Sequence, residues 1–211
     1  MRTVSAEVGS DLWRYLHVGT IGGACFQAIM ADGKGRQTLL KNKIEERKTW
    51  ESSLPCKTVL QRNRGAILEP YAVNIYTLNS KWDIYEVGKV VVINDYIVIS
   101  PDVMNFNLFD NRCRAGAEVK CYGLDKHNSI IKKGEMPNSN KGQVQGYVGF
   151  LKAEIWDYVL YHPQAKIKYG QISVKPDHDY FQELSQKVDR FIEELKTGSD
   201  LTGQLTNSIK E

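Results

Sequence analysis

Acidic and basic side chains that suit a metal-dependent reaction lie close together in the stretch GAEVKCYG, from Gly116 to Gly123. In an extended strand the side chains alternate between two faces, so Glu118 and Lys120 point to one side while Ala117 and Val119 point to the other. We expect the apolar pair to face a core. The charged pair would then face a cleft.

A second carboxylate comes from the segment ISPD, which ends at Asp102. Oxygen ligands suit Mg²⁺, which keeps several waters and normally takes only one or two protein carboxylates. We therefore predict that Asp102 and Glu118 bind a divalent metal beside a phosphodiester. Lys120 would position the attacking water and balance charge. A solvated strand face with a cross-strand ion pair has the same pattern, and the short motif alone does not separate the two interpretations.

The composition is that of an ordinary globular chain, with 211 residues, 42% hydrophobic and 25% charged. This length suits one large domain, expected over residues 1–198, with a flexible tail over residues 199–211. The apolar runs are too short for a membrane span, and the N-terminus lacks the apolar core of a signal peptide, so a cytoplasmic location is expected. Four widely spaced cysteines without a C-x-x-C pair argue against a zinc or iron–sulfur framework.

Charge is distributed unevenly along the chain. Residues 34–64 carry nine Lys/Arg and three Asp/Glu, whereas residues 177–211 carry four basic and eight acidic residues. A basic front half favours binding to a polyanion with salt-dependent affinity. A solubilising, solvated face has the same composition, so both interpretations stay open.

Turns and helices are predicted for the first third of the chain. Gly19, Gly22 and Gly23 lead into a run with helical spacing, and such a segment can bind phosphate through free N–H groups. Its spacing is not that of a P-loop or a dinucleotide fingerprint. A basic amphipathic helix is predicted over residues 37–50, and a third helix over residues 58–78. The apolar positions of the third helix are Leu60, Ile67, Leu68, Tyr71, Ile75 and Leu78.

The third helix also carries a candidate third acidic group for the metal site. Gly65 and Glu69 are four residues apart and share a helix face. Glycine inside a helix costs ~1 kcal/mol relative to alanine, which suggests that something needs room there. An exposed glutamate beside a packing glycine is the alternative.

Two β-branched runs joined at an Asn-Asp pair predict a hairpin over residues 86–100. Pro101 should stop its second strand and leave Asp102 at the strand end. Residues 109–116 are expected to form a turn that brings the next strand beside this hairpin. Asp102 and Glu118 would then meet across neighbouring strands.

The polar, turn-rich stretch 123–142 is expected to be a long loop, either a mobile clamp on substrate or an insertion. Helical spacing resumes in GQVQGYVGFLK, with Gln143 near its start, and two strands follow. Asp177 is predicted to cap a last amphipathic helix. Core positions are expected at Val144, Tyr147, Val148 and Leu151 and then at Phe181, Leu184, Val188, Phe191, Ile192 and Leu195.

Four motifs stand in one order along the chain, RGAILE, ISPD, GAEVKCY and GQVQGY. Their order and spacing resembles the YqaJ-type viral recombinase, or phage lambda exonuclease, family of PD-(D/E)-x-K nucleases. The resemblance also covers the opening VGTIGGACFQAIM and the ending HPQAKIKYGQISVKPDHDYFQEL, and so spans most of the chain. It implies an α/β fold with a restriction-endonuclease-like mixed β-sheet core flanked by helices.

What the resemblance implies is a Mg²⁺-dependent exonuclease, with Mn²⁺ an expected substitute. Such an enzyme digests the 5′ strand of linear duplex DNA and leaves a 3′ single strand for recombination by strand annealing. Asp102 and Glu118 match the metal-binding acids, with the backbone carbonyl of Val119 a further ligand, and Lys120 matches the catalytic lysine. Two further catalytic positions are the helical glutamate Glu69 and the helix-starting glutamine Gln143.

The family also implies partners. These are double-stranded DNA ends, a single-strand annealing protein and a homo-oligomer, which in some members is a ring-shaped trimer. The location would be the cytoplasm of a phage-infected or prophage-bearing bacterial cell. Lambda-type enzymes hold the terminal 5′ phosphate with an arginine and a serine, and this chain has His17 and Ala24 at the matching positions. Candidate DNA or 5′-phosphate-binding residues are Arg14, His17, Arg62 and Arg64.

Two other functions stay open on the sequence. A site-specific endonuclease on the same fold would cut covalently closed circles, which an exonuclease spares. A non-catalytic DNA-binding module would keep the basic segment and show no metal dependence.

Overall fold

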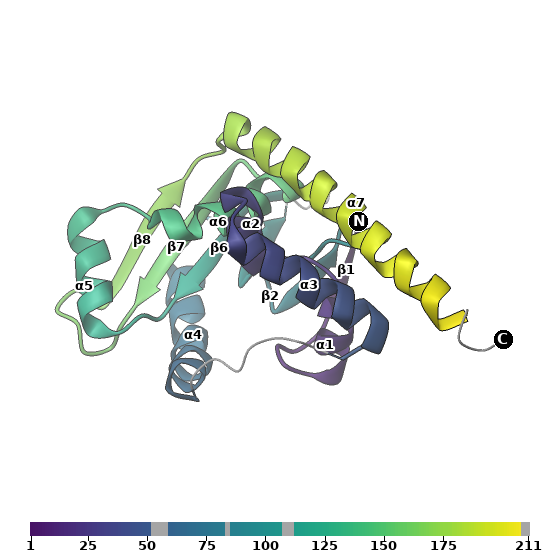
Figure 1. Ribbon diagram of the computed structural model, residues 1–211. Helices are drawn as coiled ribbons and strands as arrows, with labels where there is room; N and C mark the ends of the chain where they lie inside the picture. Colours follow the sequence, from purple (N-terminus) through teal and green to yellow (C-terminus); the bar gives the residue numbers. More distant parts are fainter. Residues whose placement is uncertain (52–58, 83–84, 107–111, 208–211) are drawn as a thin grey trace.

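Two β-sheets, with helices on both faces of the larger one, make up the fold (Figure 1). Within the described ranges, no helix has the length and apolar character that crossing a bilayer requires. The structure, a computed structural model, describes residues 1–51, 59–82, 85–106 and 112–207, with the backbone alone for residues 59–63, 85 and 199–207. The helices are α1 Asp11–His17, α2 Gly23–Ala31, α3 Lys34–Thr49, α4 Val59–Asn79, α5 Leu124–Lys133, α6 Lys141–Leu151 and α7 His178–Asn207.

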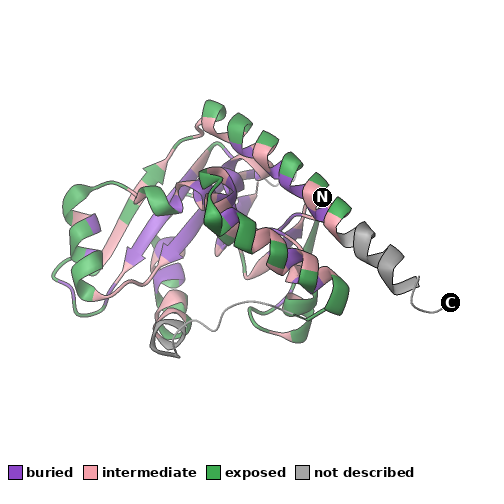
Figure 2. Ribbon diagram, viewed as in Figure 1, coloured by how far each residue is buried: buried purple, intermediate pink, exposed green. Residues whose placement is uncertain are grey.

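The larger sheet has the strand order β2-β5-β6-β7-β8. It is mixed, because β6 and β7 pair in parallel while the other neighbours are antiparallel. Figure 2 shows its central strands as buried, as expected for strands covered on both faces. The predicted mixed sheet flanked by helices is confirmed. The strands are β2 Tyr85–Val87, β5 Val103–Phe106, β6 Cys113–Lys120, β7 Ile155–Tyr161 and β8 Tyr169–Val174.

The smaller sheet contains the predicted hairpin. Strands β3 and β4 pair in antiparallel fashion, and the side-chain oxygen of Asn94 accepts hydrogen bonds from the backbone N–H groups of Tyr96 and Ile97, both at 2.9 Å. The expectation that the strand of Glu118 lies beside this hairpin is wrong. The hairpin pairs with β1, whereas β6 pairs with β5 and β7. The strands are β1 Arg2–Ser5, β3 Lys89–Val92 and β4 Val98–Ile99.

Asp102 lies where the chain passes from one sheet to the other. Pro101 has no N–H for a ladder hydrogen bond, and the chain enters the larger sheet at Val103. Asp102 therefore precedes β5 instead of ending the hairpin. Because Val103 pairs with Ala117, Asp102 still comes beside Glu118. Their predicted meeting across neighbouring strands is confirmed, but with a different pair of strands.

The turn predicted over residues 109–116 is also incorrect in part. Cys113–Gly116 form the first half of β6, while residues 107–111 lie outside the described residues. Gly116 is required inside this strand, because a Cβ there would overlap the indole ring of the fully buried Trp156. Close packing against β7 therefore explains the glycine at this position.

Helix α4 packs on one face of the larger sheet, but with a different side from the one predicted. Ala72 and Tyr76 are fully buried, whereas the expected core residues Ile67 and Leu78 are 61% and 85% exposed. Glu69, Ala72 and Tyr76 recur at helical spacing and turn toward the sheet. Tyr76 fixes this face to the sheet, because its hydroxyl donates to Asp157 of β7 at 2.9 Å.

The stretch 123–142, expected to be a loop, contains α5 and a short 3₁₀ helix, Asn138–Asn140. His127 and Ile130 are the buried positions of α5. The helix ends at Gly134, whose φ of 66° is a conformation that glycine adopts without strain. The high content of lysine and asparagine conceals a helical pattern with a narrow apolar face.

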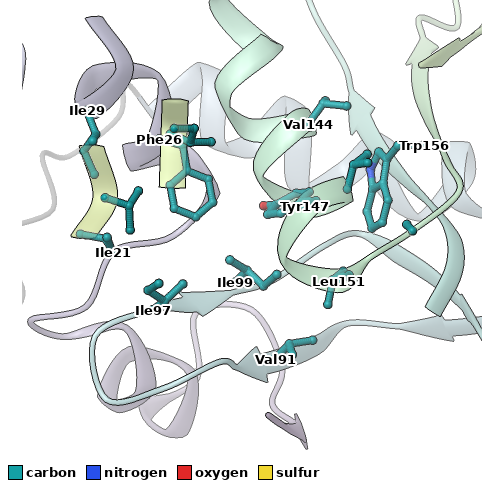
Figure 3. Close-up of a cluster of buried hydrophobic side chains, with 14 of the residues drawn as sticks. Ile21, Phe26, Ile29, Val91, Ile97, Ile99, Val144, Tyr147, Leu151 and Trp156 are labelled. Atoms are coloured by element: carbon teal, nitrogen blue, oxygen red, sulfur yellow. The ribbon is translucent and has the colours of Figure 1, made fainter. Parts of the chain in front are cut away.

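The main core lies on the opposite face of the larger sheet, between the strands and helices α2, α6 and α7. Figure 3 shows Phe26 of α2, Val144 and Tyr147 of α6, and Trp156 of β7 gathered in this core. The predicted core positions of α6 are buried, and those of α7 are buried or half-buried.

Helix α7 begins as predicted, because the backbone N–H of Tyr180 donates to Asp177 Oδ1 at 3.0 Å. The helix continues to Asn207, beyond the expected domain end at residue 198. Residues 208–211 lie outside the described part of the chain.

Part of the basic charge on α3 is used inside the molecule. Arg36 donates to Glu194 of α7 at 2.7 Å, and the buried Lys43 donates to Glu46 at 2.7 Å. The acidic C-terminal helix thus neutralises part of the basic front half. The charge that α3 can offer to a polyanion is smaller than the count over residues 34–64 suggests.

Candidate active site

Two carboxylates and an ammonium group meet beside the central strand β6. Lys120 Nζ donates a hydrogen bond to Glu118 Oε1, and the backbone N–H of Val119 donates to Asp102 Oδ2 at 2.6 Å. Glu118 is only 2% exposed, and a quarter of the Lys120 side chain is exposed. The charged face of the strand is therefore a largely enclosed site and not an open, solvated surface.

Helix α6 supplies the next contact to Glu118. Gln143 Nε2 donates to Glu118 Oε1 at 2.7 Å and to the Tyr147 hydroxyl at 3.1 Å. Oε1 of Glu118 thus accepts from both Lys120 and Gln143. Glu118 Oε2 is buried, and no described residue hydrogen-bonds to it. A buried carboxylate oxygen without a donor is costly unless a cation binds there.

The start of α6 is fixed from two sides. Asn140 Oδ1 accepts hydrogen bonds from the hydroxyls of Tyr122, two residues after the end of β6, and Tyr158 on β7, at 3.1 and 3.2 Å. The side chain of Asn140 therefore ties α6 to the sheet and does not cap the helix. Gln27 of α2 takes over this role, because its Oε1 accepts from the Gly142 N–H at 2.9 Å.

Sequence reasoning did not find these positioning residues. An asparagine directly before a helix is a recognisable signal, but it predicts a cap, and the observed partners are two tyrosines, one just after β6 and one on β7. For Gln27 the sequence carries no signal, since its partner lies 115 residues away.

The acidic side chains of the site, Asp102, Glu118 and Glu69, repel one another. Burial, Glu118 and Glu69 raise the pKa of Asp102 well above its usual range. Burial alone would lower the pKa of Lys120, but the carboxylates of Glu118 and Asp102 outweigh it and raise that pKa. The acids are thus compensated only in part by Lys120.

Glu69 approaches the site from α4, because it lies on the face of that helix that turns toward the sheet. Together with Asp102 it lines a cavity of about 60 Å³, to which Trp13 of α1, Lys89 and Ser100 also contribute. A Cβ at Gly65 would meet no described atom, so packing does not require glycine at that position. The role expected for Glu69, a third acid near the metal ligands, is compatible with this placement.

The donor set suits a hard divalent cation with few protein ligands. Among the described residues, no three Asp, Glu, His or Cys side chains cluster as a metal site. Two carboxylates, from Asp102 and Glu118, and the carbonyl of Val119 would leave several positions to water, as Mg²⁺ prefers. The unpartnered Glu118 Oε2 and the mutual repulsion of the acids are what such a cation would relieve.

The candidate phosphate-binding residues of α1 make contacts within their own helix. Arg14 is exposed and pairs with Asp11 at 3.2 Å. His17 stacks on Trp13, with ring centroids 4.0 Å apart, and its Nδ1–H donates to the Trp13 carbonyl at 2.7 Å. Burial lowers the pKa of His17, with a further contribution from Lys43, which favours a neutral ring. The residue of α1 that lines the cavity beside Asp102 is Trp13.

Arg64 of α4 lies beside Gly123. Its Nη1 is 3.3 Å from the position that a Cβ would take on Gly123, directly before α5. Its charge, after burial and His127, contributes to lowering the pKa of His162. The side chain of Arg62 lies outside the described residues. None of the described candidates Arg14, His17 and Arg64 lines the cavity beside Asp102.

No known protein-family model matches the chain, and no curated protein matches its sequence. Solved structures do match. LHK-Exo in complex with dAMP has a TM-score of 0.83 at 20% identity, over 95% of this chain and 100% of that one. The alkaline exonuclease LHK-Exo from Laribacter hongkongensis, in another crystal structure, has a TM-score of 0.81 at 18% identity over the same shares.

A phage-related exonuclease from Haemophilus somnus 129PT has a TM-score of 0.59 at 12% identity, over 91% of this chain and 99% of that one. These likenesses extend over nearly the whole of each chain, so they concern the complete arrangement of sheets and helices. This chain therefore has the α/β fold of the alkaline and phage-related exonucleases.

Proposed function

We propose that this protein is a metal-dependent exonuclease that digests the 5′ strand of linear duplex DNA and leaves a 3′ single-stranded overhang. The observation that carries the proposal is the buried, unpartnered Glu118 Oε2 beside Asp102, with Lys120 and Gln143 bound to the other oxygen. The exonuclease fold and the order of the four sequence motifs support the same activity. LHK-Exo was crystallised with dAMP, and a deoxynucleoside monophosphate is the product expected of this reaction.

Each residue of the site has a chemical role in this proposal. Asp102, Glu118 and the Val119 carbonyl would hold Mg²⁺ or Mn²⁺. A bound ion of this kind supplies polarisation of the scissile phosphate and a water of lowered pKa. Lys120 orients the water and offsets the negative charge that develops on the phosphate. Gln143 keeps Glu118 in place.

The wider setting of this activity follows from the family resemblance. The substrate would be a double-stranded DNA end, and the overhang would be passed to a single-strand annealing protein during recombination. A homo-oligomer, as in the ring-shaped trimers of some family members, would keep the enzyme on its substrate. The reaction would take place in the bacterial cytoplasm.

Digestion of end-labelled linear duplex, beside a closed circular control, tests the proposal. The wild type should release nucleotides from the 5′ end in Mg²⁺, spare the circle and stop in EDTA, and Lys120→Ala should be inactive. Cutting of the circle would establish an endonuclease instead. Binding of linear duplex without any digestion in Mg²⁺ would identify a non-catalytic DNA-binding module.

A further inference from the structure

We propose that Tyr147 and Gln143 form a clamp that limits Glu118 to a single metal-binding oxygen and thereby selects Mg²⁺ over the larger Ca²⁺. The inference rests on the proposed function and deepens it, because it concerns the metal selectivity of the same site. Tyr147 is a positioning residue in this account, since it acts on the metal ligand through Gln143.

The clamp uses both hydrogens of one amide group. The Nε2 group of Gln143 carries two N–H donors, and it contacts Glu118 Oε1 at 2.7 Å and the Tyr147 hydroxyl at 3.1 Å. A flipped amide would present its oxygen to the carboxylate of Glu118 and lose the attraction. With both donors engaged, the orientation of the Gln143 side chain is fixed.

Tyr147 is itself held rigidly. It is 2% exposed, and its ring packs against Trp156 with ring centroids 5.5 Å apart. The hydroxyl lies against the first residue of α2, where a Cβ on Gly23 would overlap it. The phenol therefore has no room to move away from Gln143.

The two carboxylate oxygens of Glu118 therefore differ in their hydrogen bonding. Oε1 receives hydrogen bonds from Lys120 and Gln143, whereas Oε2 is buried and unpartnered among the described residues. Binding through Oε2 alone leaves both hydrogen bonds intact. A bidentate contact would have to turn Oε1 toward the ion and break them.

Mg²⁺ and Ca²⁺ differ in what they require of a carboxylate. Mg²⁺ takes octahedral geometry with few protein ligands and several waters, which a single oxygen of Glu118 satisfies. Ca²⁺ takes six to eight oxygens, often including a bidentate carboxylate, in a flexible geometry. A clamped Glu118 therefore favours the smaller ion, and a loosened one would accept the larger ion more readily.

Calorimetric titration of the full-length protein with Mg²⁺ and, separately, Ca²⁺ tests this inference. Tyr147→Phe removes only the hydroxyl, and Gly23→Ala displaces it from the other side. In both variants the Mg²⁺ affinity should fall about tenfold, as expected when a group that orients a metal ligand is lost, while the Ca²⁺ affinity should not fall. The ratio of the two affinities should thus drop about tenfold.

Tyr76→Phe is the matched control. It also removes a buried tyrosine hydroxyl, which donates to Asp157 at 2.9 Å, but on the face of the sheet that packs against α4. Its Mg²⁺ to Ca²⁺ affinity ratio should equal that of the wild type. A changed ratio in this control would mean that general loosening, and not the clamp, sets the selectivity.

The possible failures can be told apart. A wild type that binds neither ion overturns the metal-dependent function and the inference with it. A wild type that binds Ca²⁺ at least as tightly as Mg²⁺, or a Tyr147→Phe variant that changes both affinities equally or not at all, overturns the clamp alone. If Tyr147→Phe does not fold, as judged by circular dichroism, the titration of Gly23→Ala decides.

Discussion

The carboxylate of Asp102 is held at a cost to stability. Burial and the charges of Glu118 and Glu69 act against its ionised form, and Lys120 and the Val119 N–H compensate only in part. An acid whose pKa is raised on folding stabilises the folded state less once the pH exceeds its ordinary value. Such repulsion is typical of a site arranged for a ligand and not for stability.

Asp102→Asn should therefore stabilise the metal-free protein and abolish digestion. The amide removes the charge but keeps an oxygen to accept the Val119 N–H. The melting temperature in EDTA at neutral pH should rise by a few degrees, since about 1 kcal/mol shifts it by roughly 2–4 °C in a domain of this size. Differential scanning calorimetry gives the shift, and the end-labelled duplex gives the activity.

Asp157→Asn is the contrasting control for this experiment. Asp157 is also buried, but its two oxygens accept hydrogen bonds from Tyr76 at 2.9 Å and Ser173 at 2.6 Å. Replacing this satisfied carboxylate should lower the melting temperature. A fall of similar size in Asp102→Asn would show that Asp102 has a structural role.

Helix α7 depends on a single capping residue at its start. Asp177 accepts the Tyr180 N–H and pairs with Lys141 of α6 at 2.8 Å, so it also ties the two helices together. The hydrogen bond with Lys141, followed by that of the Tyr180 N–H, lowers the pKa of Asp177 below its ordinary value of 3.8. A lowered pKa means that the ionised form is favoured by folding.

Asp177→Ala should lower the free energy of unfolding by about 1 kcal/mol at pH 7, the usual loss for a helix cap. The contribution of Asp177 is fully present above its unfolded pKa and is lost as the pH falls through its lowered folded pKa. Urea denaturation should therefore give a difference between the two proteins that is constant near neutrality and shrinks below about pH 4. Asp179→Ala, which removes a charge from the same turn without the cap, should have a smaller effect at pH 7.

The sequence predicts an element well where periodicity and a cap agree. Val144 and Leu151 of α6 recur at helical spacing, and Asp177 marks the start of α7. For α4 the same periodicity indicates the wrong face, because Ile67 is apolar but exposed and the sheet receives Ala72 instead. Hydrophobicity alone does not reveal which face can approach a sheet closely.

The charged part of the site could be predicted because its motifs are local. Asp102 and Glu118 stand beside residues that define a strand end and a strand, and their meeting follows from antiparallel pairing. Which sheet contains the hairpin could not be predicted, because it depends on β1, a short strand without an alternating pattern. The positions of Arg14 and His17 depend on how α1 packs, which no local pattern specifies.

In the molecule as a whole, helix α3, from the N-terminal part of the chain, is bonded to helix α7, near the C-terminus. Arg36 is 8% exposed and makes two hydrogen bonds to Glu194, at 2.7 and 2.9 Å. Its guanidinium also lies 5.3 Å from the centre of the Phe191 ring. Arg36 is therefore part of the structure and is not available to DNA, although it belongs to the basic segment.

Arg36→Ala and Lys41→Ala should separate stability from DNA binding. Arg36→Ala should lower the free energy of unfolding by about 1.5–3 kcal/mol, as expected for a lost hydrogen bond to a charged group, and leave the salt dependence of duplex binding unchanged. Lys41 is exposed on the same helix, and its replacement should spare stability. It should reduce the slope of log affinity against log salt by about one.

Fluorescence anisotropy with a labelled duplex in Ca²⁺, at several salt concentrations, measures these slopes. A reduced slope for Arg36→Ala would mean that the pair with Glu194 opens to bind DNA. An unchanged slope for Lys41→Ala would place the DNA path away from this helix.

The hydrogen bond between Gln27 and Gly142 also has a consequence for the order of folding. It joins segments 115 residues apart, and α6 must be docked before Gln143 can reach Glu118. Contacts of such long sequence separation form late, because the intervening chain must first be ordered. Nuclease activity should thus be the last property to appear during refolding. A folding intermediate in which α6 has not yet docked would contain Asp102 and Glu118 but would lack the contact from Gln143 to Glu118.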